Sequence, residues 1–539
     1  MKYIYTMIAI LLPTIALGQD FKFLSEQAEN GKSVNVQQVE YTVSPQKVKE
    51  PALDYKLTWS YADKTKENAA IHYNFACREM LNLEYILLKG ETNKYETKIE
   101  HILSDSEMYE DEKAKYEAFE KMLAEIPEDA KKSSYQIRQE GTAAHKSAAY
   151  AHYVSLPKAE FPMEDAKKFV SGYSPIYRRL ETASKCDHCD FDHKIRNNRD
   201  FIALLLPEVQ EMRGLARWLA VKAKIEIYEG RFDDAVKTIR LGLEMSNHMV
   251  EEPILVTQLV GIAIRSIMFS CLIELAQEPN APNLYWALTD IDSLTPAYKG
   301  AIECEMNIIP WMMPTFGKAV NDTEKMTDND WRMMNDEFSK IVPYITDSFG
   351  NINSDGFAIA NIAISLTAYP NAVQRLLEQG ITREEIDAMP VATVIGKYSV
   401  ARFKTQRDEV LKQANLPIWQ TEAPSDTPFI DGRVTPTDIL VSLLFPAVNA
   451  AKGAYARTDF SLDAMRITEA IRDYAADHDG KLPEKLSDIT SLPIPPISPF
   501  SGTPYSYKIQ DGAAVIESEQ HHNYHGYYHS FYRVIIRLK

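Results

Sequence analysis

The sequence predicts a mostly α-helical protein with a small α+β domain at its C-terminal end. Apolar residues recur at three- and four-residue spacing through most of residues 65–416, which places them on one face of each helix. After one further long helix, apolar residues alternate at 505–509, 514–517 and 532–538, which is typical of half-buried strands. We therefore expect a large N-terminal helical domain, followed by a long helix packed on a three- to four-stranded antiparallel sheet.

The composition is that of a globular protein. Of 539 residues, 45% are hydrophobic and 25% are charged, and the formal net charge is −17. Such an acidic chain repels phosphate groups unless basic residues gather in a patch, and no run of Lys or Arg marks one. We therefore expect neither nucleic acid nor an anionic membrane surface as a partner.

The first residues match a secretory signal peptide. Lys2 supplies the positive charge, residues 4–17 are apolar, and Ala16 and Gly18 are the small residues before a cleavage site. We expect residues 1–18 to be removed by cleavage after Gly18. An uncleaved N-terminal anchor is the alternative. No later segment is expected to be long enough to span a membrane, so the mature chain is predicted to be exported, either periplasmic or secreted.

Residues 19–64 are expected to form an extended N-terminal arm. Within it, the alternating residues 33–41 predict a short edge strand or an extended segment. Helical periodicity then predicts helices near 65–89, 93–126, 128–153, 163–184, 198–229, 232–248, 253–277, 318–345, 355–379 and 383–415.

One pair of these helices is expected to form a tight hairpin. Gly230 permits a sharp turn, and Ala235 lets the two helices approach closely. Residues 227–235 resemble the turn of a tetratricopeptide hairpin. No copies follow at a period of about 34 residues, and an ordinary antiparallel helix pair is the alternative. The next helix, 253–277, is apolar on nearly all sides and is expected to lie at the centre of a helical core.

The domain boundary is expected in the Pro-rich residues 417–435. Residues 436–539 then predict a self-contained helix-plus-sheet domain. Pro436 suits the first turn of its long helix, Gly480 suits the left-handed residue that ends it, and Asp511-Gly512 suits a hairpin turn.

This order of elements, with Asp479-Gly480-Lys481-Leu482-Pro483 and residues 498–507 (SPFSGTPYSY), resembles the pseudopilin fold of type II secretion proteins. The resemblance covers roughly residues 440–518. It implies the fold only: the chain lacks a prepilin cleavage site, an assembling N-terminal helix and the Asp-rich loop with which some members bind calcium. Ser498 also stands where members often carry Asp. Other segments, including residues 281–288, resemble exported bacterial proteins of unknown function.

The densest group of metal-ligating residues is Cys186, His188, Cys189 and His193. Thiolate and imidazole are the ligands that Zn²⁺ prefers, and two Cys three residues apart can chelate it. A Cys186–Cys189 disulfide, two structural thiols or thiol redox chemistry are the alternatives. The remaining thiols lie in apolar helical contexts and are expected in the core: Cys77, Cys271 and Cys304.

A second group contains His521, His522, His525 and His529. An exposed aromatic loop between two strands and a metal site are the two interpretations. The motifs of serine hydrolases, zinc proteases, phosphate-binding loops and dinucleotide-binding folds are absent.

These observations favour a non-enzymatic, exported cell-envelope protein of unknown function that binds or scaffolds a protein partner and needs no cofactor. The alternative is a metal-dependent envelope enzyme that uses zinc at the Cys186–His193 segment.

Overall fold

The computed structural model describes residues 22–27, 33–87, 153–171, 174–193, 207–334, 336–337, 367–421, 436–518 and 530–539. The expected signal peptide, the helix expected at 93–126 and the His521–His529 group lie outside these residues. So does nearly all of the helix expected at 128–153.

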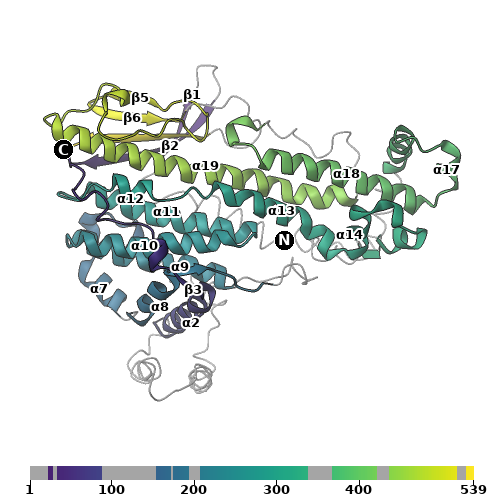
Figure 1. Ribbon diagram of the computed structural model, residues 1–539, viewed down its shortest axis with the longest axis horizontal. Helices are drawn as coiled ribbons and strands as arrows, with labels where there is room; N and C mark the ends of the chain where they lie inside the picture. Colours follow the sequence, from purple (N-terminus) through teal and green to yellow (C-terminus); the bar gives the residue numbers. More distant parts are fainter. Residues whose placement is uncertain are drawn as a thin grey trace, which may run out of the picture.

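The described chain is mostly helical, as predicted, with a small mixed sheet (Figure 1). The principal helices are α2 (Ala69–Leu87), α7 (Met163–Ser171), α8 (Ser174–Ser184), α9 (Pro207–Tyr228), α10 (Phe232–Glu251), α11 (Leu255–Gln277), α12 (Tyr285–Thr289), α13 (Thr295–Met312), α14 (Pro314–Asn321), α17 (Arg383–Ala388), α18 (Val391–Ala414) and α19 (Pro436–Asp477).

The larger sheet has the strand order β1-β2-β7-β6-β5. Its strands are β1 (Lys22–Gln27), β2 (Ser33–Val43), β5 (Ser506–Gln510), β6 (Ala513–Glu517) and β7 (Ser530–Leu538). β2 runs parallel to β7, with Val39 opposite Val534 and Val43 opposite Leu538, whereas the other neighbours are antiparallel. The prediction of a purely antiparallel sheet from the C-terminal residues is therefore wrong, because the strand expected at an edge is inserted between β1 and β7.

Helix α19 is the central element of the fold. Its 42 residues span about 63 Å at 1.5 Å per residue. The sheet lies on one side of its C-terminal half, and α11 and α12 lie on the other (Figure 1). Its apolar side chains pack into this core, with Phe460, Ala464, Ile467 and Ile471 all buried.

The ends of the C-terminal elements follow the predicted turn residues. Gly480 has φ +72°, and its N–H donates to the Ala475 carbonyl at 2.9 Å, which ends α19. Asp511 and Gly512 both have positive φ, at 49° and 72°, and connect β5 to β6 as a tight hairpin.

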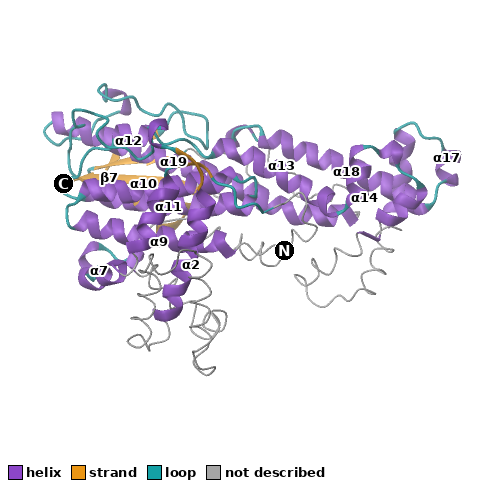
Figure 2. Cartoon of the chain, turned by 60° about the horizontal axis from the view of Figure 1, so that its bottom comes forward, coloured by secondary structure: helices purple, strands orange, loops and turns teal. Residues whose placement is uncertain are grey.

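A second part of the core extends away from the sheet (Figure 2). There, α13, α14 and α18 pack around the N-terminal end of α11 and the N-terminal half of α19. Helix α11 is long and apolar enough to span a membrane, so the expectation that no later segment qualifies is wrong on that point. However, 72% of its most apolar window is buried inside the structure, as predicted for a central core helix.

Several predicted helices differ at their boundaries. The helix expected at 318–345 is interrupted, because α14 already ends at Asn321 and α-helical residues resume only at 328. Residues Thr65–Asn68 form a strand, β3, before α2 begins, and the helix expected at 163–184 is divided into α7 and α8. The helix expected at 383–415 is divided at Pro390, because proline lacks the N–H that would continue it. Thr382 and Glu385 form a capping box at the start of α17.

Candidate functional site

The segment that contains Cys186 begins as the short strand β4 (Cys186–His188), which pairs in parallel with β3. Thr65 lies opposite Cys186, and Asn68 lies opposite His188. The Asn68 side chain donates to the Asp190 carbonyl at 2.7 Å and accepts from the Asp190 N–H at 2.9 Å. These contacts hold the loop after β4 against the start of α2.

Two glutamates at the end of α10 hold the rest of this loop. The Cys189 N–H donates to Glu251 at 2.7 Å, and the Phe191 N–H donates to Glu252 at 2.9 Å. The second oxygen of Glu252 lies 2.6 Å from Nδ1 of His193, whose ring stacks on Phe191. His193 is thus bonded to a carboxylate inside the protein.

The four residues predicted to bind zinc do not converge. Cys186 and Cys189 are both buried, and their thiols are free in this structure. A disulfide between them in the oxidised protein stays a prediction. His188 is exposed beside Asp187, with Nδ1 2.8 Å from the carboxylate. No three of the four place ligand atoms within 4.8 Å of one another. A zinc ion held by these four side chains would require the loop to rearrange.

A different group of ligands meets at Cys186. Among the described residues, Glu67, His72 and Cys186 place one ligand atom each within 4.8 Å of the others. Glu67 is on β3, His72 is in the first turn of α2, and Cys186 is on β4. The sequence does not indicate this group, because Cys186 is more than a hundred residues from the other two. The only local signal was an acid and a histidine five residues apart.

Neither thiol of the Cys-x-x-Cys pair is activated. Burial raises the pKa of the Cys186 thiol, and the nearby Glu67 carboxylate raises it further. Burial also raises the pKa of the Cys189 thiol, with Glu251 and Glu252 adding to the effect. Both thiols are therefore protonated at neutral pH, which disfavours the redox interpretation.

A buried pair, Tyr73 and His248, contacts the backbone of β4. The Tyr73 hydroxyl is 2.8 Å from Nδ1 of His248, and Nε2 of His248 is 3.0 Å from the Cys186 carbonyl. Burial lowers the pKa of His248 to about 4, so the ring is neutral at pH 7. Since a carbonyl only accepts, Nε2 carries the proton, and Tyr73 donates to Nδ1. This pair fixes the backbone at Cys186.

A polar cleft of about 540 Å³ lies on another surface. The loop after β2, the turn between α9 and α10, and the loop before α12 form its walls. Its lining residues are Gln46, Lys47, Lys49, Tyr55, Gly230, Arg231, Phe232, Asp233, Asp234, Lys237, Asn280, Pro282 and Asn283. Its charges are paired within the protein: Lys49 with Asp54 at 2.7 Å, and Arg231 with Asp234 at 3.0 Å.

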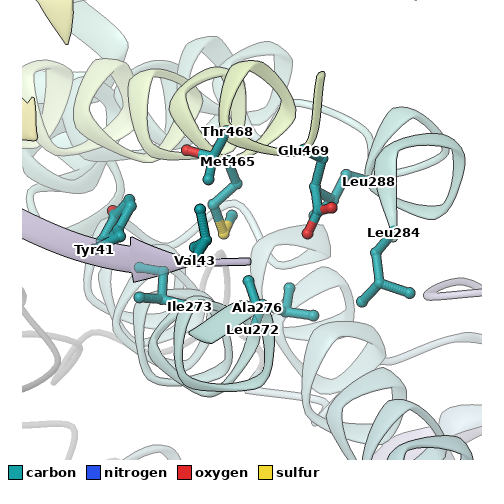
Figure 3. Close-up of a pocket in the computed structure, with 10 residues that line it drawn as sticks. All are labelled: Tyr41, Val43, Leu272, Ile273, Ala276, Leu284, Leu288, Met465, Thr468 and Glu469. Atoms are coloured by element: carbon teal, nitrogen blue, oxygen red, sulfur yellow. The ribbon is translucent and has the colours of Figure 1, made fainter. Parts of the chain in front are cut away.

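A second cavity, between β2, α11 and α19, is a packing void. Figure 3 shows Tyr41 and Val43 of β2 facing Met465 and Thr468 of α19 across it. Its volume is about 10 Å³, which is at most enough for about one water molecule. It is therefore too small for a ligand.

The two surface features differ in chemistry. The group of Glu67, His72 and Cys186 offers oxygen, nitrogen and sulfur ligands, whereas none of the described residues that line the polar cleft is a Cys, His or Ser. The ligand group therefore suits a metal ion, and the cleft suits a polar binding partner. No protein-family model matches the chain, and neither a curated protein nor a solved structure matches it.

Proposed function

We propose that this chain is an exported cell-envelope protein that binds a protein partner without catalysing a reaction, and that the polar cleft is its docking site. The observation that carries this proposal is the chemistry of the cleft. About 540 Å³ is enough for several side chains of a partner, and its walls carry charges of both signs without a nucleophile–base pair.

The arrangement of these charges favours a polypeptide over a small anion. Arg231 already bonds Glu229 at 2.6 Å and Asp234 at 3.0 Å, and Lys237 lies 3.4 Å from Asp234. An isolated phosphate or carboxylate would have to compete with these carboxylates. A partner segment with both acidic and basic side chains can instead complement both signs at once, which favours specific recognition.

We also propose the finer layout expected from the sequence. Residues 65–416 would be the helical body, with one tetratricopeptide-like hairpin at Gly230. Residues 436–539 would be the pseudopilin-like unit, joined by residues 417–435. The support is that the sheet and the C-terminal half of α19 share a core cluster that includes few residues of the helical body. In this layout the cleft lies where the hairpin turn meets the loop after β2.

The partner proposal is tested by charge reversal in the cleft. The mature protein and its Lys49→Glu/Lys237→Glu variant are used to capture partners from envelope extract. Lys299→Glu, an exposed position in α13 outside the cleft, is the control. A partner that is retained by the control and lost by the double variant supports the proposal. Equal capture by all three proteins would exclude the cleft.

Export is tested separately. N-terminal sequencing of the protein recovered from the envelope or medium is expected to begin at Gln19. A sequence that begins at Met1 would contradict cleavage after Gly18.

A metal-dependent envelope enzyme is the second candidate, because Cys186 converges with two further metal-ligating side chains at the surface. A hydrolytic activity that is lost on chelation and restored by zinc would favour it. The ligand set of that enzyme would then differ from the one expected from the Cys-x-x-Cys sequence, since only Cys186 belongs to the converging group.

A further inference from the structure

Three chemically different ligands meet where β3, β4 and the first turn of α2 adjoin. The ligand atoms of Glu67, His72 and Cys186 all lie within 4.8 Å of one another, and Nε2 of His72 is 3.4 Å from Oε2 of Glu67. Tetrahedral zinc with bonds of about 2.0–2.3 Å places its ligand atoms roughly 3.3–3.8 Å apart. Side-chain movements of about 1 Å would therefore close the group around an ion.

The backbone that carries these ligands is held in place. Thr65 is paired with Cys186 across the two strands, and its N–H donates to the Lys185 carbonyl at 2.7 Å. Asn68 accepts from the Ala70 N–H at 3.0 Å at the start of α2, one turn before His72. Together with the bonds between Asn68 and the loop after β4, these contacts fix the three ligands on elements that are joined to one another.

We propose that Cys186, His72 and Glu67 bind a divalent transition-metal ion of the zinc class. A thiolate with an imidazole and a carboxylate is a donor set for zinc, whereas calcium and magnesium require oxygen ligands. This site is distinct from a Cys-x-x-Cys chelate, because Cys189 is not one of its ligands.

The burial of the three side chains differs in a way that leaves room for a further ligand. Cys186 is buried, whereas the side chain of His72 is 24% exposed and that of Glu67 is 60% exposed. Three protein ligands with solvent on one side leave the fourth position of a tetrahedral ion to water. An ion held in this way is open to a substrate or to a ligand atom from a partner.

Proton balance sets the pH dependence of binding. Without an ion, the thiol is protonated, and Sγ of Cys186 lies 3.5 Å from the Thr182 carbonyl. Binding requires the thiolate, so the thiol proton is released to solvent as the sulfur–metal bond forms. The apparent affinity should therefore rise with pH until the thiol is already deprotonated in the metal-free chain.

The test uses the full mature chain in its reduced form, with its free thiols counted before each titration. Cobalt(II) is the probe, because a cobalt–thiolate bond gives a charge-transfer absorption band, and zinc is then added to displace it. We expect one ion per chain. Loss of an outer-shell partner alone weakens metal binding by about 10–100-fold, so His72→Ala and Glu67→Gln should each weaken it by at least about tenfold. Cys186→Ser should abolish the band.

The controls separate this site from the ligand set expected from the sequence. Cys189→Ser and His188→Ala should bind cobalt as the unmodified protein does. If Cys189→Ser abolishes the band while His72→Ala retains it, the ion is bound by the Cys-x-x-Cys segment and the proposal is wrong. Failure of the reduced, unmodified chain to bind one ion would also overturn it. His72 and Glu67 are partly exposed, so their variants decide the question even if Cys186→Ser does not fold.

Discussion

Nη1 of Arg472 lies 2.8 Å and 2.9 Å from the two carboxylate oxygens of Glu469, and both side chains are buried. The same guanidinium donates from Nε to the Ser44 carbonyl at 3.0 Å and from Nη2 to the Ala281 carbonyl at 2.8 Å. Ser44 follows β2, and Ala281 precedes α12. One side chain of α19 therefore joins two segments that are distant from it in the sequence.

Removing this guanidinium should strongly destabilise the fold. Arg472→Met leaves the Glu469 carboxylate buried without its cation, which costs about 3–5 kcal/mol of unfolding free energy in comparable buried pairs. Arg472→Met/Glu469→Met should recover part of that loss, because neither charge is then left unpaired. Urea denaturation measures both changes.

The matched control for this prediction is an exposed pair of the same spacing. Nζ of Lys412 lies 3.4 Å from Oε2 of Glu409 in α18, and both side chains are exposed. Lys412→Ala should therefore lower the unfolding free energy by less than about 1 kcal/mol. Equal losses for Arg472→Met and Lys412→Ala would show that the buried pair does not hold the three segments together.

Two adjacent residues of β2 test its place in the sheet. Val43 is fully buried opposite Leu538, whereas Thr42 is exposed on the other face. Val43→Asp would bury an unpaired carboxylate and should cost several kcal/mol, whereas Thr42→Asp should change stability by less than about 1 kcal/mol. Thermal unfolding monitored by circular dichroism compares the two. Similar melting temperatures would contradict the burial of Val43 against the core.

Acid should destabilise the protein through His248. Its pKa is about 4 in the folded chain, against 6.5 without the protein environment, because burial disfavours the charged ring. The unfolded chain therefore takes up this proton first as the pH falls. Above pH 6.5 the ring is neutral in both states, so it costs no stability. As the pH falls from 6.5 to about 4, protonation favours the unfolded chain and the unfolding free energy decreases. The pKa difference corresponds to about 3 kcal/mol.

A glutamine at this position separates the charge from the hydrogen bond. His248→Gln can still donate to the Cys186 carbonyl but does not titrate, so its unfolding free energy should depend less on pH between 6.5 and 4. Urea denaturation at several pH values measures the slope. His188→Gln, at an exposed position, should keep the slope of the unmodified protein. An unchanged slope in His248→Gln would exclude His248 as its source.

The features that the sequence predicted correctly are local. Gly480 ends α19 and Asp511-Gly512 turns β5 into β6, because the positive φ that each position needs is a property of the residues themselves. The parallel pairing of β2 with β7 was not predicted, since alternation shows that residues 33–41 form a strand without identifying its neighbour.

The candidate site illustrates the same limit. Cys186 is expected to group with Cys189, His188 and His193 because they are neighbours in the chain. In the structure, strand alternation and the α10 glutamates direct these side chains to different surroundings, and β3 brings Glu67 to Cys186 instead. Sequence proximity identified one ligand and could not identify the others, because their approach depends on the pairing of β3 with β4.

Two glycines within helices should respond oppositely to the same substitution. A Cβ on Gly261, in α11, would lie 2.9 Å from the Ser246 carbonyl oxygen of α10, and backbone cannot move aside as a flexible side chain can. A Cβ on Gly300, in α13, would meet nothing within 4 Å. Gly300→Ala should therefore raise the unfolding free energy by about 0.5–1 kcal/mol, because alanine favours the helix. Gly261→Ala should lower it by about 1–3 kcal/mol, since α10 and α11 must separate. Chemical denaturation of the two variants measures the difference, and a stabilised Gly261→Ala would show that these helices are not in close contact.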